Sequence, residues 1–70
     1  MKTIRVGVMP GRINEYVVEV GTSVTEVLEM AGLNPSGYDV KMDGEKINPQ
    51  EAFVNEDTNL ILLAKQVKGN

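Results

Sequence analysis

The sequence predicts a single α+β domain in which a mixed sheet of four to five strands packs on one helix. Three observations lead to this fold class. Residues 2–9 alternate between apolar and polar side chains, which is typical of a half-buried strand. Residues 24–31 carry apolar side chains at helical spacing. Residues 59–65 are apolar on both faces, as a central strand requires.

The N-terminal part predicts a hairpin. Strands are expected over residues 2–9 and 15–20, with Pro10-Gly11 at the centre of a type II turn between them. The apolar faces of the two strands are formed by Ile4, Val6, Val8, Tyr16, Val18 and Val20. Both strands are therefore expected to turn one side toward a common core.

The helix is predicted from both its ends and its apolar stripe. Ser23 and Glu26 have the spacing of a capping box, in which each side chain satisfies a free helix amide. The stripe consists of Val24, Val27, Leu28 and Ala31. Gly32 is placed to end the helix in the left-handed conformation, and Leu33 can then fold back onto its last turn.

The C-terminal half predicts two short strands over residues 38–42 and 45–47, joined by an Asp43-Gly44 turn. A short helical turn over residues 49–53 and a polar turn over 55–58 lead to the last strand. The last strand is expected to lie parallel to the first, in the middle of the sheet. We expect the domain to span residues 1–66 and a flexible tail to occupy 67–70.

Composition excludes several classes of function. The 70 residues include no cysteine and no histidine, which removes disulfides, thiolate nucleophiles, imidazole bases and the usual zinc sites. The net charge of −3 argues against nucleic-acid binding, and no apolar run is long enough to span a bilayer. We therefore expect a cytoplasmic protein that is not an enzyme, holds no metal or cofactor and makes no membrane contact.

The passage from strand to helix carries a family resemblance. Residues 18–24, followed by Val27-Leu28 and the Ala31-Gly32-Leu33 end of the helix, resemble the ubiquitin-like β-grasp superfamily. The resemblance is strongest to the small prokaryotic sulfur carriers of thiamine and molybdopterin synthesis, in which comparable turns stand where this chain has 43–45 and 55–58. It implies a β-grasp fold.

The resemblance also directs attention to the C-terminus. Sulfur carriers work through a flexible tail that ends in Gly-Gly, because an adenylating enzyme must thread the terminal carboxylate into its site. This chain ends Lys68-Gly69-Asn70 and so lacks that pair. Gly69 and Asn70 are the candidate carrier tail, on the hypothesis that the C-terminus is altered or processed.

The sheet face turned away from the helix is the second candidate site. We place Leu60 and Leu62 toward the helix, so that Ile61 and Leu63 point outward. The predicted partner-binding residues are Arg5, Val17, Lys41, Ile61, Leu63 and Lys65. Apolar patches with a polar rim tend to be interaction sites. The alternatives are that these residues are simply good sheet formers, or that the face pairs in a homodimer.

The loop of the first hairpin adds a third candidate, because Arg12 and Ile13 are expected near its tip. Taken together, the residues predict a ubiquitin-like module that binds a protein partner non-covalently, as a monomer or weak homodimer. The alternative is a sulfur carrier or ubiquitin-like modifier. A nucleic-acid-binding β-grasp module is a third interpretation, which would need a basic stripe on one face.

Overall fold

A computed structural model describes residues 1–9 and 11–65 of the chain. Over these residues the chain forms five strands and one helix: β1 (Lys2–Met9), β2 (Ile13–Val18), α1 (Val24–Met30), β3 (Tyr38–Met42), β4 (Glu45–Ile47) and β5 (Leu60–Lys65). Pro10 of the predicted first turn, the tail predicted over 67–70, and with it Gly69 and Asn70, lie outside the described residues.

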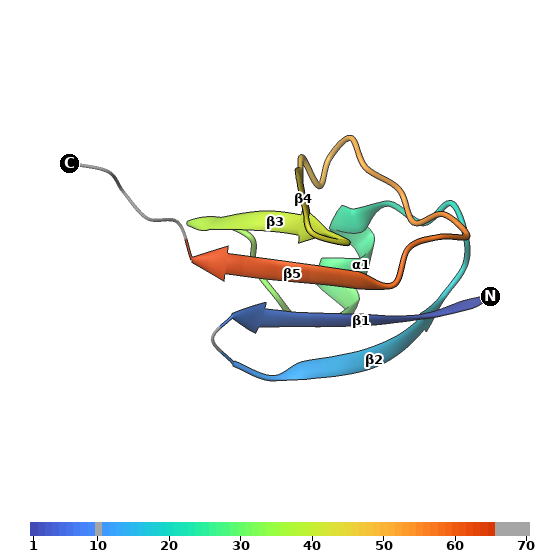
Figure 1. Cartoon of the computed structure of the whole chain (residues 1–70), viewed down its shortest axis with the longest axis horizontal. Coiled ribbons are helices and arrows are strands. Elements are labelled where there is room, and N and C mark those ends of the chain that lie inside the picture. Colours follow the sequence, from blue (N-terminus) through green and yellow to red (C-terminus); the bar gives the residue numbers. More distant parts are fainter. Residues whose placement is uncertain (10, 66–70) are drawn as a thin grey trace.

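The five strands form one mixed sheet in the order β2-β1-β5-β3-β4. β1 and β5 run parallel, and the other neighbouring pairs are antiparallel. Figure 1 shows β1 and β5 side by side, with their arrows pointing the same way and α1 behind the sheet. The prediction of a central last strand parallel to the first is confirmed.

The helix has the N-cap residue and the C-terminal glycine that its sequence predicts. Ser23 is the N-cap, and its hydroxyl oxygen accepts a hydrogen bond from the Glu26 amide at 3.2 Å. At the other end Gly32 adopts a φ of 71°, which reverses the chain. The Leu33 amide then donates to the Leu28 carbonyl at 2.9 Å, which completes a Schellman motif. Residues next to the helix therefore mark both of its ends.

An aliphatic core lies between the sheet and α1. Its buried residues are Ile4, Val6, Val18, Val24, Val27, Leu28, Val40, Val54, Ile61 and Leu63. Each such side chain contributes about 1.5–3 kcal/mol on burial. The helix supplies three of these residues from one stripe, as its spacing predicts. Val54 lies in the segment between β4 and β5, and the remaining core residues come from β1, β2, β3 and β5.

The predicted orientation of β5 is wrong. Ile61 and Leu63 are 0% and 1% exposed and belong to the core, whereas Leu60 and Leu62 are half-buried on the opposite face. The cause is the parallel register with β1, which pairs Ile61 with inward-pointing Val6. Paired residues in neighbouring strands point to the same side of a sheet, so Ile61 must point inward as well.

The second strand is also displaced from its prediction. It begins at Ile13 and ends at Val18, two residues earlier at each end than expected. Tyr16 and Val18 face the core side as predicted, but Val20 lies beyond the strand and is exposed. The shorter connection from β1 leaves residues 11 and 12 between the strands, together with position 10.

The turn between β3 and β4 holds the start of β5. Asp43 and Gly44 have φ values of 52° and 88°, as a type I′ turn requires. The Asp43 carboxylate accepts hydrogen bonds from the amides of Asn59 and Leu60, each at 3.0 Å. The Asp43 amide in turn donates to the Leu60 carbonyl at 2.8 Å. This one residue therefore fixes the entry of the central strand.

The segment before β5 packs along the start of the helix. The predicted helical turn is a single hydrogen-bonded turn, in which the Glu51 amide donates to the Asn48 carbonyl at 2.9 Å. The Thr25 hydroxyl donates to the Pro49 carbonyl at 2.9 Å, and the Val24 amide donates to the Ala52 carbonyl at 3.0 Å. The Val24 bond, together with a bond from the Thr25 amide to the Pro49 carbonyl at 3.3 Å, satisfies amide groups that a helix start leaves free.

Candidate protein-binding face

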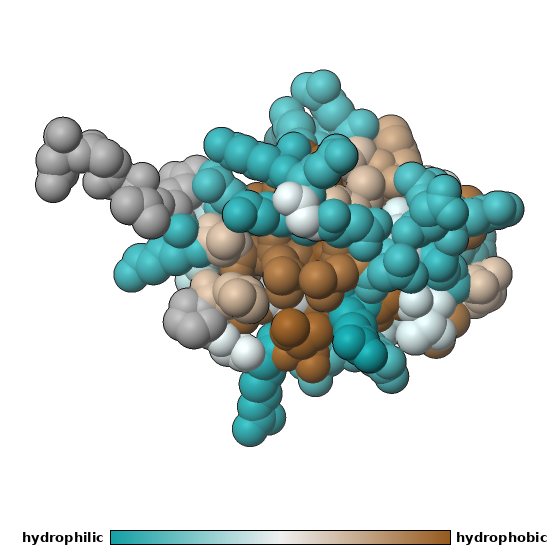
Figure 2. All heavy atoms as spheres, viewed as in Figure 1, coloured by the Kyte–Doolittle hydropathy of each residue, from teal (hydrophilic) through white to brown (hydrophobic). Residues whose placement is uncertain are grey.

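The outer face is the side of the sheet that is turned away from α1. Alternation along each strand places on it Thr3, Arg5, Gly7, Met9, Ile13, Glu15, Val17, Asp39, Lys41, Lys46, Leu60, Leu62 and Ala64. Figure 2 views this side and shows apolar atoms gathered over its middle, with hydrophilic side chains around them. The face therefore has an apolar centre and a polar rim.

One row of paired residues crosses all five strands at this centre. In order from β2 to β4 it consists of Ile13, Gly7, Leu62, Lys41 and Lys46. The β2 side of the row is apolar, and the two residues on β3 and β4 are lysines. A partner that docks here would contact aliphatic groups over most of the row and positive charge at its β3–β4 end.

Gly7 allows Ile13 to lie over β1. A Cβ atom at residue 7 would come within 2.7 Å of the Ile13 Cα and 2.8 Å of its Cγ1. The isoleucine side chain thus occupies the space that a side chain at position 7 would fill. Gly7 is buried under it even though it lies on the outer face. The absence of a side chain at Gly7 brings the apolar surfaces of β2 and β5 toward each other.

A second row is formed by Glu15, Arg5 and Leu60. The Arg5 Nε atom lies 3.9 Å from the Glu15 Oε2 atom, and both side chains are exposed. An exposed pair at this distance contributes little to stability. Exchanging this ion pair for contacts with a partner would therefore cost little free energy.

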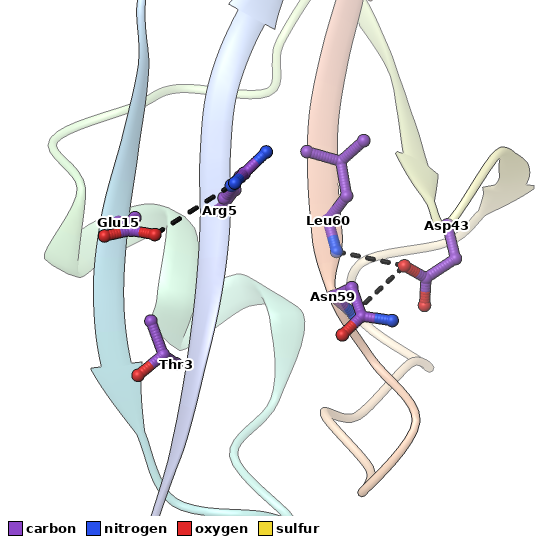
Figure 3. A pocket seen from close by; sticks show the side chains of 6 residues that line it. All are labelled: Thr3, Arg5, Glu15, Asp43, Asn59 and Leu60. Atoms are coloured by element: carbon purple, nitrogen blue, oxygen red, sulfur yellow. Dashed lines mark hydrogen bonds and ion pairs between the residues drawn. The ribbon is translucent and has the colours of Figure 1, made fainter.

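This row borders a hollow of about 590 Å³ lined by Thr3, Arg5, Glu15, Asp43, Asn59 and Leu60. Figure 3 shows the Arg5–Glu15 pair on one side of it and the Asp43 carboxylate, bound to the start of β5, on the other. Asp43 already accepts two backbone hydrogen bonds, so its position is set by the fold. The hollow therefore adds a mainly polar depression beside the apolar centre, with Leu60 as its one apolar lining residue.

The other end of the face is formed by Met9, Ala64 and Asp39 in a third row. The Lys46 ammonium group lies 3.5 Å from an oxygen of the Asp39 carboxylate. Charges of both signs therefore surround the apolar centre, which favours a specific orientation of any partner over indiscriminate adhesion.

The predicted site residues are only partly brought together. Arg5, Val17 and Lys41 lie on the outer face and are exposed, as expected. Ile61 and Leu63 are in the core and cannot contact a partner while the domain is folded.

Lys65 pairs with Tyr38 at the end of β5, in register with the inward residues, so it belongs to the helix side of the sheet. Its predicted place in the outer rim is therefore wrong as well. Arg12 and Ile13 are both exposed, and Ile13 joins the outer face.

The apolar residues that sequence reasoning missed are Met9, Leu60 and Leu62. Met9, Ile13 and Val17 are 51%, 43% and 57% exposed, which marks them as surface residues in spite of their hydrophobicity. The signal that could have found Leu62 is Gly7, since a glycine in the middle of a strand often marks a close approach of another chain segment.

Over positions 1–9 and 11–65, no group of three or more acidic side chains is arranged to hold a metal ion, histidine and cysteine being absent from the chain. Within the same ranges, no helix has the length and apolar character needed to cross a membrane.

Comparisons with known proteins bear on the fold. No protein-family model and no curated protein matches this sequence. Among solved structures, the chain is similar to a computationally designed protein based on the template of human erythrocytic ubiquitin, determined by NMR in solution. The TM-score is 0.54 at 19% sequence identity, over 100% of this chain and 98% of the other. The predicted ubiquitin-like β-grasp fold is therefore confirmed, and at this identity the likeness concerns the fold alone.

Proposed function

We propose that this domain is a cytoplasmic, non-catalytic module that binds a protein partner through its outer face. The observation that carries the proposal is the apolar centre of that face, formed by Ile13 and Leu62 around Gly7 and enlarged by Met9. Exposed apolar groups with a polar rim tend to mark interaction sites. Val17 and Arg5 keep the role predicted for them in this proposal.

The surrounding charges indicate what the partner surface should offer. Lys41 and Lys46 lie at one border of the apolar row, and Arg5 lies beside its centre. A complementary partner would bring an apolar patch bordered by carboxylates toward the lysines. Such pairs at a rim mainly set the orientation and the association rate, and the buried apolar contact supplies most of the affinity.

The test compares two substitutions of the same kind on opposite sides of the domain. Leu62→Glu places a charge in the apolar centre, and Met30→Glu places one on the exposed side of α1. Proteins recovered from the host by the wild-type domain are quantified by mass spectrometry. We expect a specific partner to be retained by Met30→Glu and lost by Leu62→Glu, with circular dichroism showing that both variants fold. Retention by both variants contradicts the proposal.

The second candidate function is a sulfur carrier or ubiquitin-like modifier whose C-terminus is altered or processed. It is supported by the ubiquitin-like fold and by Gly69, which removal of Asn70 would make the last residue. The intact mass of the untagged protein from its own host distinguishes the two functions. Loss of Asn70, or replacement of a terminal oxygen by sulfur, favours the carrier. An unmodified mass that includes Asn70 favours non-covalent binding.

A further inference from the structure

The two edges of the sheet differ in how they are protected. β4, at one edge, has three residues and carries Glu45 and Lys46. β2, at the other edge, has six residues and contains neither lysine nor proline. Proteins usually block an edge by shortening it or by adding proline or charged residues, above all lysine, because a long edge without them can pair with another chain. Glu15 is the one charged residue of β2. The β2 edge therefore remains open to an added strand.

The register shows which backbone groups face this edge. The Val8 amide donates to the Arg12 carbonyl at 3.3 Å, which makes this pair a hydrogen-bonded one. Hydrogen-bonded and non-hydrogen-bonded pairs alternate along an antiparallel ladder. The direction of the Arg5 N–H fits this alternation, because it points away from β2 and donates to the Asn59 carbonyl at 2.9 Å. Arg5 is the partner of Glu15, so the pair they form is not hydrogen-bonded.

It follows that Ile13, Glu15 and Val17 direct their N–H and C=O groups to the open edge. The side chains of the same three residues lie on the outer face. A strand added beside β2 would thus exchange backbone hydrogen bonds with them. It would also place its own residues i, i+2 and i+4 directly opposite their side chains. The order that these side chains present is apolar, acidic, apolar.

We propose that β2 binds an extended peptide of the pattern apolar–x–basic–x–apolar, which adds to the sheet as a sixth strand. The peptide's central Lys or Arg lies opposite Glu15, and its apolar residues lie opposite Ile13 and Val17. Glu15 is available for this pairing because it is exposed and because its ion pair with Arg5, at 3.9 Å, is a weak one. The inference concerns the sheet edge and does not depend on the function proposed for the middle of the outer face.

A second copy of this chain fits the edge poorly. In an antiparallel β2–β2 pair that matches Ile13 with Val17, each Glu15 lies opposite the Glu15 of the other copy. A register that matches Val17 with itself places Glu15 opposite Glu19. Like charges directly opposite each other destabilise a strand pair, and the chains each carry a net charge of −3. Glu15 therefore disfavours a second copy in these two registers and favours a basic partner.

The test uses two seven-residue peptides with capped ends, TVTKTVT and TVTETVT. Their pattern is the same in both directions, so the central residue lies opposite Glu15 whichever way the strand runs. Binding to the full 70-residue chain is followed by NMR titration, and amide hydrogen exchange identifies the protected groups. We expect the lysine peptide to bind about fivefold more tightly than the glutamate peptide, from the size of cross-strand charge effects. We also expect it to slow exchange at Ile13, Glu15 and Val17.

Variants of two acidic residues complete the experiment. Glu15→Lys should reverse the preference, so that the glutamate peptide binds more tightly. Glu19→Lys changes net charge by the same amount just outside β2, and should leave the preference for the lysine peptide in place. Equal affinity for both peptides, equal effects of the two variants, or protection confined to β1 and β5 would overturn the proposal. So would dimerisation of the free chain through β2.

Discussion

Replacing Asp43 by alanine should destabilise the domain more than its exposed position suggests. Its carboxylate accepts hydrogen bonds from the amides of Asn59 and Leu60, each at 3.0 Å, and so holds the start of the central strand. Its φ of 52° lies in the left-handed region, which aspartate tolerates better than alanine does. The substitution therefore removes two acceptor contacts and adds backbone strain in a single step.

The structure gives the expected magnitude. Each hydrogen bond is exposed to solvent, so we assign about 1 kcal/mol to each. The left-handed conformation adds about 1 kcal/mol for alanine. Asp43→Ala should therefore lower the free energy of unfolding by about 3 kcal/mol. A domain of 70 residues is stable by only about 4–10 kcal/mol in total, so the loss is a large fraction.

Two further variants at Asp43 separate the causes. Asp43→Gly loses the hydrogen bonds without the strain and should cost about 2 kcal/mol. Asp43→Asn keeps an oxygen acceptor and tolerates the left-handed conformation, so it should cost less than about 1 kcal/mol. Urea denaturation followed by circular dichroism measures all three against the wild type. If the glycine variant is as stable as the wild type, the two hydrogen bonds contribute nothing and the reasoning is refuted.

Three other substitutions test the packing and the turns. Ile61→Ala should lower the free energy of unfolding by about 3 kcal/mol because the side chain is fully buried, whereas Leu62→Ala should lower it clearly less. Equal losses in urea denaturation would contradict the orientation of β5. Gly7→Ala should cost about 2 kcal/mol and shift the amide NMR signals of the first hairpin, since the new Cβ would meet the Ile13 backbone at 2.7 Å. Gly32→Ala should cost only about 1 kcal/mol in the same denaturation assay. The cost comes from its φ of 71°, since no atom outside its chain neighbours lies within 4 Å of the new Cβ. A much larger loss would mean that tertiary packing opposes the change.

The helix illustrates what could be predicted from sequence. Ser23 and Gly32 act on amides and carbonyls within a few residues of themselves, so their effect does not depend on the rest of the fold. The turn at Asp43-Gly44 is local in the same sense. These signals gave the order of the elements, and that order restricts the sheet to few arrangements.

The orientation of β5 could not be predicted in that way. Residues 60–64 are all apolar, so alternation along the strand carries no information about which side is buried. The answer comes from the register with β1, a contact between the two halves of the sheet. A shift of one residue exchanges the two faces of a strand completely, which is why Ile61 and Leu62 were interchanged.

The inverted orientation of β5 explains which residues of the outer face are predicted correctly and which are not. Arg5 and Lys41 are predicted correctly because β1 and β3 alternate clearly, and Val17 because it lies between Tyr16 and Val18, which point to the core. The contributions of β5 were inverted, so Leu62 was missed. The contacts of the Asp43 carboxylate with the start of β5 were equally out of reach, since they join residues far apart in the sequence.

The parallel pairing of β1 with β5 has a consequence for synthesis of the protein. Arg5 pairs with Leu60, 55 positions later, so the centre of the sheet joins early and late parts of the chain. On the ribosome, β1 and its hairpin emerge long before their central neighbour is translated. The sheet can close only after β5 has left the exit tunnel, and until then one side of β1 exposes unpaired backbone groups. Folding of this domain is thus a late event that follows translation of the last strand.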